Sequence, residues 1–232
     1  MKTCTAKKTS FYSWLGLILA SFFIAACGGD NGKGAMYRVT VTNTTHNQPM
    51  SPVAVMLHKD EYSGWKIGSA ASFGLEDLAE SGNPMAFLDE NSMAQDAMQG
   101  EGVLMPGNTE EIEVKGYYAR SLQLTIASML VNTNDAFVGV TNWDVGHLNV
   151  GERMQLLAPV YDAGTEENSE TAATVPGPAA GGEGTNSARE LHDFVTRHPG
   201  VVTKVDGYMA SALDESHRFD NGAALIVVER IH

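Results

Sequence analysis

Tyr37-Arg38-Val39-Thr40-Val41-Thr42-Asn43 is the stretch of this 232-residue chain that decides its fold. Apolar side chains alternate there with polar ones, and β-branched residues fill most of the positions. Successive side chains of an extended strand point to opposite faces, so this period of two predicts a strand with one face buried.

Further strands are expected along the rest of the chain. They are predicted at residues 53–58, 110–116, 122–129, 137–140, 154–158 and 225–231. Polar turns separate them, and Pro159 ends the strand before it because proline cannot donate to a strand ladder. Seven or eight short strands with such turns predict an all-β fold, an antiparallel β-sandwich of about eight strands.

A helical insertion and long loops interrupt the strands. Residues 72–91 are expected to contain helix, because apolar residues recur at helical spacing from Leu75 and Ser72 can cap the first turn. Residues 166–189 hold almost no large apolar side chain and are expected to form a long exposed loop. Residues 190–198 fit either a short helix or a strand.

The N-terminus has the organisation of an export signal. Lys2, Lys7 and Lys8 precede an apolar run at residues 11–26, which ends in small residues directly before Cys27. The run is shorter than the roughly 20 residues that a membrane-spanning helix needs. A cysteine at this place is the pattern of a bacterial lipobox, in which the thiol is acylated and the chain is cut before it. An ordinary signal peptide with a coincidental cysteine is the alternative.

These features predict how the chain is divided. Residues 1–26 are expected to be a lipoprotein signal peptide, Cys27 the lipidation site, and residues 27–35 a flexible, glycine-rich tether. Residues 36–232 are expected to form one domain. Gly28 is not the Asp that retains many lipoproteins in the inner membrane. We therefore expect an exported lipoprotein, anchored by its lipid and placed in the outer membrane of a two-membrane organism.

Charge and cysteine content narrow the class of partner. The whole chain has a formal charge of −13. Without residues 1–26, the chain holds 12 basic and 28 acidic residues, which gives a charge of −16. Such a surface is unsuited to nucleic acid, and it suits divalent cations or simply solubility. Cys4 and Cys27 are the two cysteines in the sequence, so the domain has none for a disulfide.

Two acidic turns flank predicted strands. Asp135 comes just before the strand at 137–140, and Asp162 and Glu166 follow the strand at 154–158. The start of one antiparallel strand can lie beside the end of its neighbour, so the three carboxylates can converge. Calcium takes about 6 to 8 oxygen ligands, including backbone carbonyls and water. From spacing alone, solvated loop carboxylates are the more common outcome.

A set of motifs resembles the N-terminal domain of the spondin family. The motifs are Tyr37–Asn43, Ser51-Pro52-Val53 with His58, Asp135–Val140, Tyr161–Glu166, Val175–Ala179 and His198-Pro199-Gly200. The resemblance covers about residues 36–231, and it implies an antiparallel β-sandwich with bound calcium and a role in adhesion.

The resemblance also implies the calcium ligands. Asp135, Asp162 and Glu166 would hold the Ca2+ ion, with Glu166 at a position where the family often has Asp. Ala136 stands where an aromatic residue is frequent, and Thr141 replaces a usual acidic residue. The partner of such an adhesion module is an unknown protein or glycan.

Two other classes of function stay open from the sequence. One is an envelope hydrolase that uses an acidic cleft with His58, although the chain offers no nucleophile with a partnered base at recognisable spacing. Ser63-Gly64-Trp65-Lys66 matches the Ser-x-x-Lys of penicillin-recognising enzymes without the companion motifs. The other class is a periplasmic carrier for a small ligand. We expect a protein that is not an enzyme.

Overall fold

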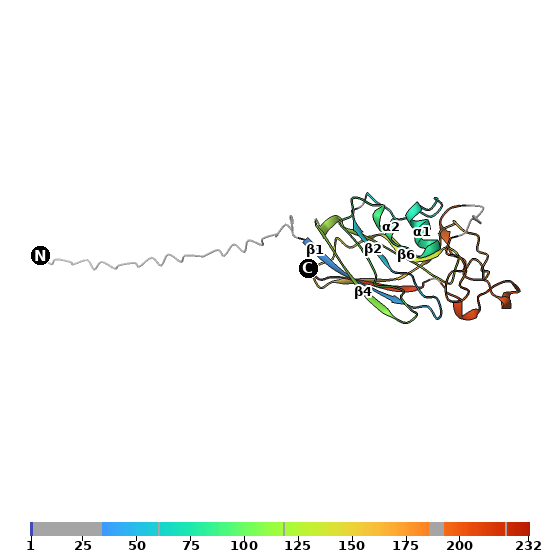
Figure 1. Cartoon of the computed structure of the whole chain (residues 1–232). Coiled ribbons are helices and arrows are strands. Elements are labelled where there is room, and N and C mark those ends of the chain that lie inside the picture. The colour runs from blue at the N-terminus through green and yellow to red at the C-terminus, as the bar shows by residue number, and fades with distance from the viewer. Residues whose placement is uncertain (2–33, 60, 118, 186–192, 221) are drawn as a thin grey trace.

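Two antiparallel sheets form a β-sandwich in the computed structural model, which describes residue 1 and residues 34–59, 61–117, 119–185, 193–220 and 222–232 (Figure 1). The strands within those residues are β1 (Gly34–Asn43), β2 (Ala54–His58), β3 (Asp96–Gln99), β4 (Thr109–Tyr117), β5 (Gln123–Met129), β6 (Ala136–Asp144), β7 (Arg153–Ala158), β8 (Val160–Asp162), β9 (Thr196–Arg197) and β10 (Ala224–Arg230). One sheet has the order β4-β1-β10-β7 and the other β3-β2-β5-β6-β8-β9. The predicted all-β sandwich is confirmed, with ten described strands rather than about eight.

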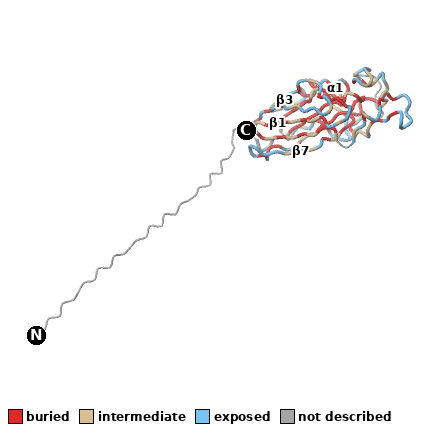
Figure 2. The backbone as a smooth tube through the Cα atoms, turned by 90° about the horizontal axis from the view of Figure 1, so that it is seen from below, coloured by how far each residue is buried: buried red, intermediate tan, exposed pale blue. Residues whose placement is uncertain are grey.

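The core lies between the sheets, and β1 shows why. Tyr37, Val39 and Val41 are buried, while the polar residues between them are only partly covered. β1 pairs antiparallel with β4 on one side and with β10 on the other, which places it in the middle of its sheet. Burying each such side chain contributes about 1.5–3 kcal/mol. Figure 2 shows the buried residues continuing along the strands while exposed residues gather in the loops.

The helical insertion covers the outer face of the six-stranded sheet (Figure 1). It consists of α1 (Phe73–Ser81) and α2 (Met85–Asp89). The Ser72 side chain accepts the Leu75 N–H, and Gly82 ends α1 in the left-handed conformation, as helix caps commonly do. The helices explain why β2 is buried at every position, since both of its faces are covered. Three short 3-10 helices complete the described helical elements: η1 (Ala119–Ser121), η2 (Lys204–Asp206) and η3 (Glu215–His217).

The expected tether at residues 27–35 is corrected at its end. Gly34 and Ala35 already belong to β1, where they pair with Tyr117 and Gly116 of β4. The side chain of Ala35 is buried in the core, which accounts for the earlier start of the strand. Residues 27–33, Cys27 and the expected signal peptide lie outside the described residues.

The expected exposed loop at residues 166–189 is also corrected. Its described part, up to residue 185, holds no named strand, but it is packed onto the sandwich. Glu166, Glu170 and Val175 are buried, and Val175 shares a small apolar cluster with Val201 and Leu213 of a later loop. One valine among polar residues gives no periodic pattern, so composition alone suggests exposure.

The strand register defines two ends of the sandwich. The start of β1 and the C-terminus lie at one end, and the loops between β8 and β10 lie at the other, which we call the distal end (Figure 1). Asn132, in the turn before β6, donates to the Asn47 carbonyl at 2.9 Å and so joins that turn to the segment after β1. Among the described residues, no helix is both long and apolar enough to cross a membrane.

Candidate metal centre

Strand pairing brings the two predicted acidic turns together at the distal end. Ala136 of β6 lies opposite Asp162 of β8, so Asp135 stands next to the end of β8. The Asp135 carbonyl accepts the Ala163 N–H at 3.2 Å. Asp135 and Glu166 are fully buried and Asp162 is 5 % exposed, so these carboxylates are not ordinary solvated loop residues.

The carboxylate of Asp135 holds the turn that follows β8. Its Oδ2 accepts the N–H of Thr165 at 2.8 Å and the N–H of Glu166 at 3.1 Å. The Thr165 hydroxyl lies 3.3 Å from the same oxygen. Oδ1 of Asp135 is buried and has no hydrogen-bond partner among the described residues. A buried acceptor without a partner is destabilising, so this oxygen marks a place for a further donor or a cation.

Asp162 and Glu166 complete the acidic group. The two oxygens of Asp162 accept the Gly164 N–H at 2.8 Å and the Asn168 side-chain amide at 2.5 Å. Oε2 of Glu166 lies 3.4 Å from the side-chain amide of Asn134. Each carboxylate is therefore held by groups of its own or the neighbouring turn, and the whole arrangement joins β6 to the segment after β8.

Burial and like charge act on Asp135 in the same direction. Desolvation is the main cause that raises the pKa of Asp135 to about 7, and the neighbouring charge of Asp162 adds to it. The hydrogen bonds from Thr165 and Glu166 lower the pKa only in part. Without a compensating charge, ionisation of this group at neutral pH therefore costs folding free energy.

The donor set fits a hard cation. The three side chains offer carboxylate oxygens only, which is the ligand type that calcium prefers. Within the described part of the chain, however, no three His, Cys, Asp or Glu side chains are gathered as a ready ligand cluster. A calcium ion beside Asp135 would therefore take backbone carbonyls and water for much of its shell. The meeting of the two turns is observed, and their role as ligands remains a prediction.

Three residues around the site were not predicted to belong to it. Asn134 and Asn168 supply amide donors to Glu166 and Asp162. His198, which follows β9, lies close enough to Asp162 for its pKa to respond to that charge. Burial lowers the pKa of His198 to about 4, so its imidazole is neutral at pH 7. The sequence feature that could have indicated Asn134 and Asn168 is their position beside the acidic motifs.

His58 has the arrangement of a structural histidine. It is fully buried, its Nδ1 lies 2.6 Å from the Lys59 carbonyl and its Nε2 lies 2.8 Å from the Thr125 hydroxyl. A carbonyl only accepts, so Nδ1 carries the proton and Nε2 accepts from Thr125. Because both ring nitrogens are engaged by the fold, the arrangement gives no support to a hydrolase built on His58.

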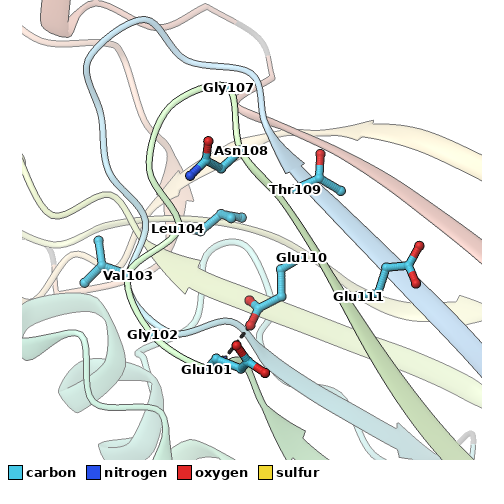
Figure 3. A pocket seen from close by; sticks show the side chains of 9 residues that line it. All are labelled: Glu101, Gly102, Val103, Leu104, Gly107, Asn108, Thr109, Glu110 and Glu111. Carbon is cyan, nitrogen blue, oxygen red and sulfur yellow. Dashed lines mark hydrogen bonds between the residues drawn. The ribbon is translucent and has the colours of Figure 1, made fainter.

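The Ser-x-x-Lys match and a second acidic region also have structural roles. The Ser63 hydroxyl donates to the Trp65 carbonyl at 3.0 Å. An acidic hollow of about 720 Å³ lies at the start of β4, lined by Glu101, Glu110 and Glu111 among others (Figure 3). Oε1 of Glu110 accepts the Glu101 N–H at 2.5 Å and thereby fastens the segment before β4. Figure 3 shows Glu111 directed away from that pair.

The fold and the acidic turns define a class of protein, an all-β sandwich with buried carboxylates at one end. Comparison with known proteins gives the family. The Spondin_N family model matches residues 41–189, more than half of the chain, so the chain belongs to the Spondin_N family. The chain is 31 % identical to the human protein Spondin-2 over 136 residues, which is 51 % of this chain and 39 % of Spondin-2. The match thus spans about two fifths of that relative. The family resemblance inferred from the motifs is confirmed.

Proposed function

We propose that this chain is an exported, lipid-anchored module that binds calcium and mediates adhesion or another interaction at the cell envelope. Membership of the Spondin_N family and the similarity to Spondin-2 support an interaction module outside the cell. The observation that carries the calcium proposal is the unpartnered, buried Oδ1 of Asp135 beside Asp162 and Glu166. The binding partner of the module would be an unknown protein or glycan.

The proposed role of the ion is structural. Asp135, Asp162 and Glu166 would hold the calcium ion, which would supply positive charge to a buried group of like charges. Asp135 already fixes the turn after β8 through the N–H groups of Thr165 and Glu166. With its negative charge compensated, that carboxylate keeps both bonds at neutral pH without the cost of an unpaired buried charge. The result is a rigid rim at the distal end.

The position of the proposed anchor agrees with a partner-binding rim at the distal end. Cys27 precedes β1, and β1 begins at the end of the sandwich opposite to the acidic turns (Figure 1). Lipid on Cys27 would hold that end at the membrane, in our proposal the outer membrane. The distal rim would then face away from the lipid surface, where a partner can reach it.

Thermal melting with and without calcium tests the proposal. Extracellular calcium modules bind with a Kd of about 10⁻⁴–10⁻³ M. At about 10 mM calcium and a Kd of about 1 mM, the gain is about 1.4 kcal/mol, or about 3–6 °C for a domain of this size. In chelator, Asp135→Asn is expected to melt above the wild type, because it removes one buried charge while its amide oxygen can still accept from Thr165.

The matched control is Asp89→Asn, which neutralises an exposed carboxylate at the end of α2. This variant is expected to keep the full calcium-dependent rise of the wild type. Asp135→Asn is expected to show little or no rise. A wild-type melting temperature that does not respond to calcium, or an equal response in Asp135→Asn, contradicts the calcium site.

A further inference from the structure

β7 is an edge strand of the four-stranded sheet, with β10 on one side and no described strand on the other (Figure 2). Arg153, Gln155 and Leu157 are its exposed residues, and their side chains lie on the outer face of the sheet. The residues between them turn toward the core of the sandwich. Leu157 is 55 % exposed, although it has a large apolar side chain.

The backbone of β7 has hydrogen-bonding groups without a partner. The Arg230 N–H donates to the Glu152 carbonyl at 3.1 Å, and the Ala223 N–H donates to the Ala158 carbonyl at 3.0 Å. Backbone groups of a strand point to alternate sides, so the even-numbered residues of β7 direct theirs toward β10. The N–H and C=O groups of the three exposed residues therefore point to the open side. Among the described residues, no group forms a hydrogen bond with them there.

The opposite edge of the same sheet, β4, is protected by side chains. The Lys115 N–H donates to Oδ2 of Asp96 at 2.8 Å. The Tyr117 N–H donates to Oε1 of Gln95 at 3.3 Å. Two exposed glutamates further along β4 add negative charge to that edge. Because an open edge strand is a template for another strand, β7 is the edge at which this sheet can be extended.

A second copy of β7 is complementary to this edge. In antiparallel pairing about a two-fold axis through Gln155, residue 153 of each copy lies opposite residue 157 of the other. Every open N–H and C=O group of the three exposed residues then has a partner in the second copy. The ladder ends where β7 ends, because Pro159 has no N–H to donate and Gly151, with a φ of 85°, lies in the turn before the strand.

The charges at the two ends of β7 are complementary in the same arrangement. Arg153, at the start of the strand, has a side chain that is 65 % exposed, although Glu229 lies 2.8 Å from it. Asp220 is exposed and lines the same cavity as Leu157, near the other end of the strand. The two-fold axis directs Arg153 of each copy toward the end that carries Asp220 in the other. Opposite charges therefore meet at this contact, in a domain with many more acidic than basic residues.

We propose that β7 is an interaction surface that pairs antiparallel with β7 of a second copy and joins the two four-stranded sheets into one. β7 starts at the end of the sandwich where β1 starts, so this pairing places the N-terminal ends of the two copies at opposite ends of the dimer. Copies anchored in two facing membranes would meet in this orientation, a consequence that rests on the proposed lipid anchor. The pairing itself requires neither the lipid nor calcium.

A cysteine at the two-fold axis tests the register. Directly opposite residues of a hydrogen-bonded antiparallel pair have Cα atoms about 5.5 Å apart, a distance that a disulfide spans. In a whole chain that carries Cys4→Ala and Cys27→Ala and so has no other cysteine, Gln155→Cys should form a disulfide-linked dimer in detergent under mild oxidation. The matched control is Glu111→Cys, an exposed position on the open side of β4, which should stay monomeric. Equal cross-linking at both positions, or none at 155, overturns the proposal.

Sedimentation equilibrium of the whole chain in detergent measures the affinity, with a dimer Kd expected between about 1 µM and about 1 mM. Leu157→Lys places a positive charge opposite Arg153 of the second copy and should weaken the dimer about tenfold or more, whereas Leu157→Glu should bind at least as tightly as the wild type. The replaced side chain is exposed, so both variants are expected to fold, which circular dichroism checks. A wild type that stays monomeric, or an equal effect of the two substitutions, contradicts the pairing.

Vesicle clustering separates this inference from the proposed anchor. Phosphatidylcholine vesicles that carry the lipidated chain should cluster, and vesicles that carry Leu157→Lys should not. Dimers in detergent without clustering would overturn the bridging of two membranes and leave the edge pairing supported. Loss of the dimer in detergent would overturn the edge pairing, whatever the response of the melting temperature to calcium.

Discussion

Glu170 is 3 % exposed, and both of its carboxylate oxygens lie 2.7 Å from the Val202 N–H that they accept. Its φ of 49° is in the left-handed region, which is uncommon for a residue with a side chain. The residue therefore fastens the loop after β8 to the loop before η2 at some cost in backbone energy. Burial raises the pKa of its carboxyl group to about 7, with Asp206 adding to the rise and Arg218 opposing it.

The raised pKa of Glu170 gives a pH dependence with a definite sign. At a pH between 4.5, the ordinary pKa of this group, and about 7, the Glu170 carboxyl group holds its proton more tightly in the folded chain than in the unfolded chain. The resulting stability is complete below that window and is lost as the pH rises through 7. Glu170→Gln stays neutral and keeps an acceptor for Val202, so its melting temperature relative to the wild type should rise from pH 5 to pH 8. A difference that does not change with pH contradicts this origin.

The identity of the acidic residues, but not their environment, was predictable from the sequence. Asp135, Asp162 and Glu166 were identified, and their turns do meet. Their burial was not predictable, because it depends on the loops that fold over them.

At the scale of elements, strands and helices were found where they carry a periodic pattern. β1 and α1 have one buried face each, and their alternation or helical spacing shows in the sequence. β3 is a four-residue edge strand with mostly exposed residues, so no alternation indicates it. β9 has two residues and is defined only by its pairing with β8, which explains why residues 190–198 were ambiguous.

The turn after β8 depends on a glycine. Gly164 has a φ of 71°, and a Cβ atom there would lie 2.4 Å from the Phe194 carbonyl oxygen. Gly181 has the same φ of 71° but open space around it, so it is a matched control. Gly181→Ala is expected to lose about 1–3 kcal/mol from backbone strain alone. Gly164→Ala adds the clash with a neighbouring backbone, for a further loss of about 1–3 kcal/mol.

Urea unfolding of the two alanine variants measures this difference. A larger loss in Gly164→Ala shows that close approach of the two chain segments, and not only the dihedral angle, requires glycine after Asp162. Equal losses in the two variants would contradict that reading. Because Gly164 lies between Asp162 and Glu166, its substitution should also weaken any response of the melting temperature to calcium, whereas Gly181→Ala should leave that response intact.

At the scale of the whole molecule, the fold places the proposed anchor and the acidic turns at opposite ends. The chain enters the sandwich at β1, and the acidic turns lie at the distal end, together with the loops between β8 and β10 (Figure 1). Antiparallel pairing of β1 with β10 also returns the C-terminus to the end where β1 starts. The surface most suited to a partner is therefore the one farthest from the proposed anchor.

The two cysteines of the chain provide a matched test of that anchor. Acylation of Cys27 would add membrane affinity of about 0.8 kcal/mol for each buried CH2 group of the lipid, whereas Cys4 lies within the expected signal peptide and would leave with it. In a two-membrane bacterium, Cys27→Ala should move the protein from the detergent phase to the aqueous phase of a Triton X-114 partition. Cys4→Ala should partition as the wild type does. Mass spectrometry should find the lipid on the N-terminal peptide of the wild type and of Cys4→Ala. A Cys27→Ala protein that stays in the detergent phase would contradict lipid anchoring while leaving the calcium proposal untouched, because that site lies within the folded domain.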